Sequence, residues 1–265
     1  ARMTEQTPIL SVQGLCAGYR GHTVLRDISF ALAPGEILCV AGESGCGKST
    51  LLRALMGADD AAEVTAGTVI LAGREPMALP RRQRQRYRCR HMGMIFQNPG
   101  ASFDPVRPYG AQFRDTLKSH GRYDARRFAA DAEEALGRLG LTDPCRLLAC
   151  RPYELSGGMN QRMAMALALL LGQRVLLADE PTSALDAVLR LQMARELKNL
   201  SRSGGMAQVV VTHDLALAQF LADTLAVLHE RRFVEYGPAD AVLRTPGPYT
   251  RRLLEAVPRL KGGSL

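Results

Sequence analysis

The sequence predicts an α/β fold with a mainly parallel core sheet, an antiparallel β subdomain and a helical insert subdomain. Apolar segments of strand length alternate with helical segments, which is typical of a parallel sheet because each parallel strand needs a crossover connection. A helical block from residue 109 to about residue 148 interrupts this alternation. A glycine-rich loop separates a short apolar strand from the helix that follows it. The 265 residues suit one such core with one insert.

The first half of the chain supplies the β subdomain and the start of the core. Strands are expected at residues 9–15, 24–30, 36–41, 68–72 and 92–96. A helix is expected at residues 48–57, because Gly57 is a typical helix stop. Residues 81–90 contain six arginines, which we interpret as a solvated helix face leading into the strand at 92–96. A lipid-contacting patch and nucleic-acid binding are the alternatives for this run.

The second half continues the alternation of helix and strand. Strands are expected at residues 175–180 and 207–212, and a hairpin at 224–228 and 232–234. Helices are expected at residues 159–171, 186–200, 214–222, 238–244 and 248–256. We assign residues 8–97 and 156–236 to the core, about 98–155 to the helical insert, and 237–265 to a C-terminal helical tail.

The amino-acid composition limits the classes of protein to which this chain can belong. Hydrophobic residues make up 46% and charged residues 23%, which suits a sizeable soluble core. The longest apolar run, residues 163–171, is far shorter than the ~20 residues of a membrane span, and the polar start shows no signal peptide. Six cysteines without a CxxC pair favour a reducing cytosol over disulfides or a metal cluster. A net charge of +8 fits attraction to ATP, anionic lipid or nucleic acid, and does not choose among them.

The glycine-rich loop matches the phosphate-binding P-loop pattern. It consists of Gly42, Glu43, Ser44, Gly45, Cys46, Gly47, Lys48, Ser49 and Thr50. Small residues let successive backbone N–H groups point at phosphate oxygens, and the following helix presents its N-terminus to the anion. Lys48 is expected to reach the β- and γ-phosphates, and the Ser49 hydroxyl to ligate Mg²⁺.

Two acids end the apolar strand at residues 175–180. In this position Asp179 is expected to hold Mg²⁺ through water. Glu180 is expected to orient or deprotonate the water that attacks the γ-phosphate.

Further motifs, in order, resemble those of ABC-type ATPases and cover nearly the whole chain. The signature is Ser156, Gly157, Gly158 and Met159, although Gln is commoner than Met at the last position. By this resemblance Tyr19 stacks on adenine, while Gln97 senses the γ-phosphate, contacts the membrane subunit and is a candidate Mg²⁺ ligand. His213 is the switch residue that contacts the γ-phosphate, and residues 183–186 form the loop that crosses the dimer interface.

The resemblance implies that ATP binds in an interface between two subunits. The signature residues precede an apolar helix, so its free amides would contact the γ-phosphate of ATP held by the partner's P-loop. The partner would be a similar, non-identical ATPase chain. Binding to the closed pair, followed by hydrolysis, would drive the motion.

Two segments resemble the peptide/nickel branch of importers, namely residues 96–105 and the tail at 245–254. Because few residues and no cysteine follow this tail, we favour nickel or a metal chelate as cargo, with di- or oligopeptides as the alternative. The resemblance implies two permease subunits, indirect contact with an external binding protein, no nucleic acid, and a place at the cytoplasmic face of the inner membrane. The helical block would form the groove that receives a permease coupling helix.

Two other classes share part of this pattern. A soluble ABC ATPase that acts on ribosomes or DNA remains open because of the arginine run. A nucleotide kinase or GTPase shares the phosphate loop, but it does not need the signature or His213.

Overall fold

A computed structural model of the protein describes residues 7–57, 62–97, 99–183 and 187–256. Its main sheet has six strands in the order β5-β6-β7-β3-β8-β9. These strands are β3 (Ile37–Ala41), β5 (Met92–Ile95), β6 (Val175–Asp179), β7 (Ala207–Thr212), β8 (Thr224–His229) and β9 (Arg232–Pro238). All neighbours pair in parallel except β8 and β9, which form an antiparallel hairpin. The mainly parallel core and the hairpin are therefore confirmed.

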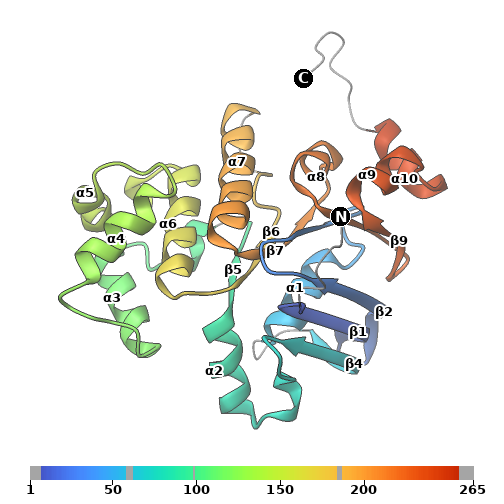
Figure 1. Ribbon diagram of the computed structural model, residues 1–265, viewed down its shortest axis with the longest axis horizontal. Coiled ribbons are helices and arrows are strands. Elements are labelled where there is room, and N and C mark those ends of the chain that lie inside the picture. The colour runs from blue at the N-terminus through green and yellow to red at the C-terminus, as the bar shows by residue number, and fades with distance from the viewer. Residues whose placement is uncertain (1–6, 58–61, 98, 184–186, 257–265) are drawn as a thin grey trace.

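A separate antiparallel sheet has the order β2-β1-β4, with β1 (Leu10–Tyr19), β2 (His22–Leu32) and β4 (Glu63–Leu71). These strands are longer than the sequence predicts, because β1 and β2 pair as far as Tyr19 and His22. Helix α1 (Lys48–Met56) packs between this sheet and the main sheet (Figure 1). Alternate residues of β3 enter two cores: Leu38 and Val40 face α1, and Cys39 and Ala41 face the opposite side.

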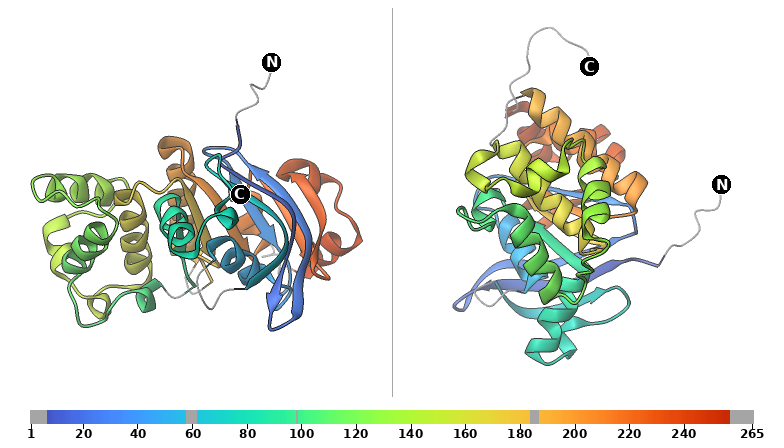
Figure 2. Two further views of the ribbon diagram at one scale, coloured as in Figure 1. Left: turned by 90° about the horizontal axis from the view of Figure 1, so that it is seen from below. Right: turned by 90° about the vertical axis from the view of Figure 1, so that its left-hand side faces the viewer.

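The insert forms a helical lobe on one side of the core (Figures 1 and 2). It contains α3 (Tyr109–Ser119), α4 (Phe128–Gly137) and α5 (Pro144–Ala149). Helix α6 (Gly157–Leu170) packs against α3 and α4 and also against β5. It thus joins the lobe to the core, and the predicted division at residue 156 stays a prediction.

The other helices are α7 (Ala187–Gly204), α8 (Leu215–Leu221), α9 (Ala239–Arg244) and α10 (Pro248–Ala256). Short 3-10 turns occur at Pro76–Ala78, Pro99–Ser102 and Pro152–Glu154. Within the part of the chain that the structure describes, no helix has the length and apolar character to cross a membrane.

Helix α2 (Arg81–His91) corrects the prediction of a wholly solvated arginine face. Arg88 is 1% exposed, and burial lowers the pKa of its guanidinium to about 10. Its Nη2 lies 3.2 Å from Met77 Sδ, and a side chain at Gly57 would collide with its Nη1. Because side chains four residues apart share one helix face, Arg84 is also drawn toward this inner side. The remaining arginines, Arg81, Arg82, Arg86 and Arg90, are exposed.

Candidate nucleotide-binding and catalytic site

The phosphate-binding loop connects the end of β3 to α1. Gly45 has φ 82° and Gly47 has φ 111°, in the left-handed region that favours glycine. Gly42 needs glycine for a different reason: a Cβ there would lie 2.5 Å from the carbonyl oxygen of Leu228. The loop is therefore packed against the end of β8 on one side and opens at Glu43, Ser44 and Gly45, which are exposed.

Lys48 is the first residue of α1 and is 5% exposed. Its Nζ donates hydrogen bonds of 2.8 Å to the carbonyl oxygens of Gly42 and Glu43. The ammonium is thus held by neutral acceptors beside the N-terminus of α1, where free backbone N–H groups favour an anion. This arrangement fits a phosphate-binding site.

Ser49 and Asp179 come together from α1 and β6. The Ser49 hydroxyl donates a 2.9 Å hydrogen bond to Asp179 Oδ1. Burial raises the pKa of Asp179, and the hydrogen bond from Ser49 opposes that rise. A hydroxyl and a carboxylate oxygen in contact at the edge of the phosphate loop are hard ligands of the kind that Mg²⁺ prefers, so these residues fit the expected metal.

Three residues predicted from separate motifs meet around the Glu180 carboxylate. His213 Nδ1 lies 3.1 Å from Glu180 Oε1, and Gln97 Nε2 lies 3.5 Å from Glu180 Oε2. The backbone N–H of Glu180 bonds to the carbonyl oxygen of Val211, and its φ is 45°. Because β5, β6 and β7 are neighbours in a parallel sheet, their carboxyl ends bring these side chains to one edge.

Ser183 belongs to the same cluster, whereas the sequence resemblance places it only in the loop that crosses the dimer interface, at residues 183–186. Its hydroxyl accepts a 3.1 Å hydrogen bond from Gln97 Nε2 and donates to the carbonyl oxygen of Glu180. Its position three residues after Glu180, in a turn, is the sequence signal that could have identified it. The remainder of the predicted interface loop, residues 184–186, lies outside the described residues.

A second missed contact ties the signature helix to the catalytic edge. The Gln161 side chain is 3% exposed and donates to the carbonyl oxygen of Pro181, the residue after Glu180. Arg162 pairs with Glu196 of α7 at 2.9 Å. Helix α6 therefore fixes the helical lobe to the segment that carries Glu180.

The signature residues lie apart from the phosphate loop of the same chain. Ser156 caps α6, and its hydroxyl accepts a hydrogen bond from the Met159 N–H. Ser156 and Gly157 are exposed, Gly158 is buried and Met159 is half-buried. Helix α6 lies in the helical lobe and α1 lies in the core (Figure 1 and the left view of Figure 2), and no hydrogen bond between described residues joins 156–159 to 42–50.

Tyr19 lies at the end of the β1–β2 hairpin, where it pairs with His22. The residue is half-buried and lines a cavity of about 900 Å³ together with Gly57 of α1 and Arg84 and Arg88 of α2. Its stacking on adenine stays a prediction.

Comparison with known families matches residues 25–183 to the ABC transporter family. The chain belongs to this family. It is 35% identical to the oligopeptide transport ATP-binding protein OppD of Haemophilus influenzae, over 96% of this chain and 80% of that protein. It is 34% identical to the dipeptide transport ATP-binding protein DppD of Bacillus subtilis, over 95% of this chain and 77% of that protein.

Solved ABC structures share the fold. The ATP-binding cassette MJ0796, solved as a post-hydrolysis dimer with ADP and Pi, has a TM-score of 0.74 at 26% identity and covers 87% of this chain and 98% of that one. The cbiO1 protein of Clostridium perfringens has a TM-score of 0.79 over 96% and 97%, and at 23% identity it supports the fold alone. The predicted ABC-type ATPase fold is confirmed, and the chain is an ABC ATPase that binds ATP.

Proposed function

We propose that this chain is the ATP-hydrolysing subunit of an importer for di- or oligopeptides. The supporting observation is that its relatives are named for oligopeptide, dipeptide and di/tripeptide transport, with 34–37% identity over at least 94% of this chain. These relatives favour di- or oligopeptides as the cargo over nickel or a metal chelate, the cargo that the tail at 245–254 suggested. That suggestion depended on the length of the C-terminal tail, and tail length has no chemical connection to the cargo.

In this proposal one group of residues binds the phosphates and Mg²⁺, and a second group activates the attacking water. Lys48 exchanges its carbonyl partners for phosphate oxygens, and Ser49 and Asp179 are placed to hold Mg²⁺, which would neutralise phosphate charge when bound. Glu180 accepts the proton of the attacking water while His213 and Gln97 fix its two carboxylate oxygens.

A second ATPase chain completes the centre by contributing its signature. The separation of residues 156–159 from residues 42–50 within one chain supports this, and MJ0796 was solved as a dimer. Two permease subunits at the cytoplasmic face of the membrane would receive the motion, with an external binding protein delivering peptide.

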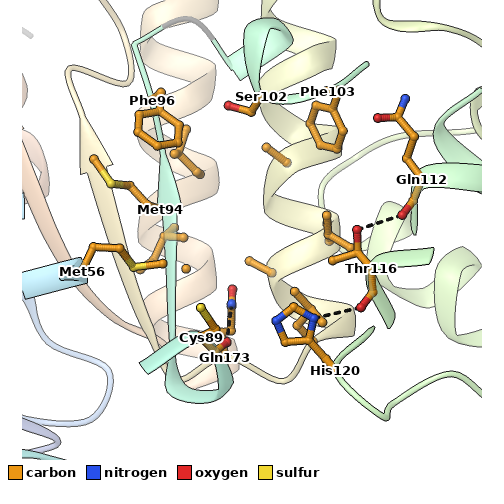
Figure 3. A pocket seen from close by; sticks show the side chains of 17 residues that line it. Met56, Cys89, Met94, Phe96, Ser102, Phe103, Gln112, Thr116, His120 and Gln173 are labelled. Atoms are coloured by element: carbon orange, nitrogen blue, oxygen red, sulfur yellow. Dashed lines mark hydrogen bonds between the residues drawn. The ribbon is translucent and has the colours of Figure 1, made fainter. Parts of the chain in front are cut away.

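A groove of about 410 Å³ lies between β5, α3 and α6, and we propose that it receives the permease helix (Figure 3). Phe96, Phe103 and Leu167 are among its apolar lining residues, and Thr116 and His120 form a polar edge. Phe96 directly precedes Gln97, which contacts Glu180. A helix that moves in this groove and displaces Phe96 would therefore also displace Gln97, which contacts the Glu180 carboxylate.

Substitution of Ala164 by Glu should remove the stimulation of ATP hydrolysis by peptide without affecting ATP binding. Ala164 is half-buried on α6 and lines the groove, so a carboxylate there would be desolvated by the incoming permease helix. We expect peptide-stimulated ATP hydrolysis by the reconstituted transporter to fall about tenfold or more, with ATP affinity of the isolated chain within about twofold.

The matched control is Ala130→Glu on the exposed face of α4, which should leave both quantities unchanged. Equal stimulation of the Ala164→Glu transporter and the unaltered one would rule out this groove as the permease site.

The cargo proposal is tested with the chain purified together with its native membrane partners and binding protein in liposomes. We expect ATP turnover to rise when the binding protein is loaded with a di- or tripeptide, and not with nickel or a nickel chelate. Stimulation by nickel alone would overturn the peptide assignment.

A further inference from the structure

The C-terminal helix α10 reaches the back of the phosphate-binding loop through Tyr249. Tyr249 is 8% exposed, and its ring stacks on the His229 ring, with centroids 3.7 Å apart and planes 23° apart. His229 ends β8 directly after Leu228, whose carbonyl oxygen excludes a side chain at Gly42. The stacked pair therefore lies where β8 meets the loop.

The Tyr249 hydroxyl is enclosed beside the loop. It has no hydrogen-bond partner of normal geometry among the described residues. Burial raises the pKa of Tyr249, the Glu43 backbone opposes that rise, and the negative charges of Glu43 and Cys46 add to it. An enclosed hydroxyl next to Glu43 is available to bond to it when the loop rearranges.

Glu43 connects this hydroxyl to the phosphate-binding lysine. Its carbonyl oxygen accepts the 2.8 Å hydrogen bond from Lys48 Nζ. On the other side, Glu235 of β9 accepts hydrogen bonds from the Gly247 N–H and the Thr250 hydroxyl, and Thr250 is fully buried. Tyr249 is therefore fixed to the core sheet at its helix and lies against the loop at its hydroxyl.

We propose that Tyr249 is a positioning residue for the phosphate-binding loop. Its ring preorganises the loop for the triphosphate through His229, and its hydroxyl is placed to bond Glu43 in the nucleotide-bound loop. The C-terminal tail thereby sets nucleotide affinity. This inference rests on nucleotide binding by residues 42–50 and is independent of the cargo, so the peptide assignment can fail without affecting it.

The test compares Tyr249→Ala, Tyr249→Phe and Leu254→Ala, using a fluorescent ATP analogue for affinity and phosphate release at saturating ATP for turnover. Tyr249→Ala should weaken nucleotide binding by about tenfold and leave turnover at saturation within about twofold, because preorganisation acts on the bound ground state and the transition state alike. Tyr249→Phe keeps the ring and should give an intermediate loss. Leu254 packs on the main core from the same helix, so its truncation should change thermal stability without changing affinity.

Alkylation of Cys46 gives a readout that does not depend on turnover. The Cys46 thiol is half-buried in the phosphate-binding loop, close enough to Tyr249 for the two groups to interact electrostatically. Peptide mapping should show faster maleimide labelling of Cys46 in Tyr249→Ala than in Leu254→Ala. Three results would each overturn the proposal. They are equal losses of nucleotide affinity in Tyr249→Ala and Leu254→Ala, an unchanged affinity in Tyr249→Ala, and a loss in Tyr249→Ala that is confined to turnover. If Tyr249→Ala does not fold, an unchanged affinity of Tyr249→Phe overturns the role of the hydroxyl.

Discussion

Replacement of Glu180 by Gln is expected to slow ATP hydrolysis by about 100-fold or more while ATP binding remains. The amide has nearly the shape of the carboxylate, but it cannot accept the proton of the attacking water. Lys48 and Ser49, which are assigned to the phosphates and Mg²⁺, make no hydrogen bond to the Glu180 side chain. Phosphate release and nucleotide affinity, measured on the same preparation, separate the two effects.

The matched control is Glu133→Gln, the same chemical change at an exposed position of α4. It should leave both hydrolysis and binding unchanged. Turnover of Glu180→Gln at the rate of the unaltered chain would remove Glu180 from its proposed role and would shift attention to His213 as the proton acceptor.

The sequence predicted much of this site because its motifs are local and each has its own physical requirement. Gly45 and Gly47 take positive φ values, and Lys48 begins α1, so the loop and its helix are readable from nine consecutive residues. Asp179 ends a buried strand and Glu180 follows it directly, and parallel pairing brings that end beside Gln97 and His213.

Contacts between distant segments could not be predicted in this way. The burial of Arg88 depends on its contact with Gly57 at the end of α1, which the spacing of residues within α2 does not predict. The contact of Gln161 with Pro181 and the stacking of Tyr249 on His229 likewise join elements separated along the chain. The cargo could not be predicted for a different reason. In the proposed importer, peptide contacts the binding protein and the permease, so no residue of this chain recognises it.

A negative charge at position 157 should block assembly of the catalytic centre and leave folding of the isolated chain unchanged. Gly157 is exposed at the first turn of α6, and a Cβ there would meet no atom within 4 Å. In the isolated chain, Gly157→Asp is therefore accommodated, and an acid at a helix N-terminus is favourable. We expect unchanged thermal stability and unchanged ATP affinity for the isolated variant.

In the assembled pair the same aspartate would face the γ-phosphate bound by the partner. Two unit charges about 4 Å apart repel by roughly 4 kcal/mol at an effective dielectric constant of about 20. That repulsion corresponds to about a thousandfold loss of ATP-driven association, which can be followed by sedimentation together with hydrolysis by the complex.

The control is Gly137→Asp, which introduces the same side chain at another exposed glycine with open space around it, on α4. It should leave association and hydrolysis intact. If Gly157→Asp associated and hydrolysed ATP as the control does, the signature would have no contact with the partner's nucleotide, and each chain would have to form a complete catalytic centre by itself. Because residues 156–159 and 42–50 lie on different lobes of one chain, such a centre would require α6 to approach α1, and the Gln161–Pro181 and Arg162–Glu196 contacts restrain that movement. The separation of the two lobes therefore favours a centre shared between two subunits.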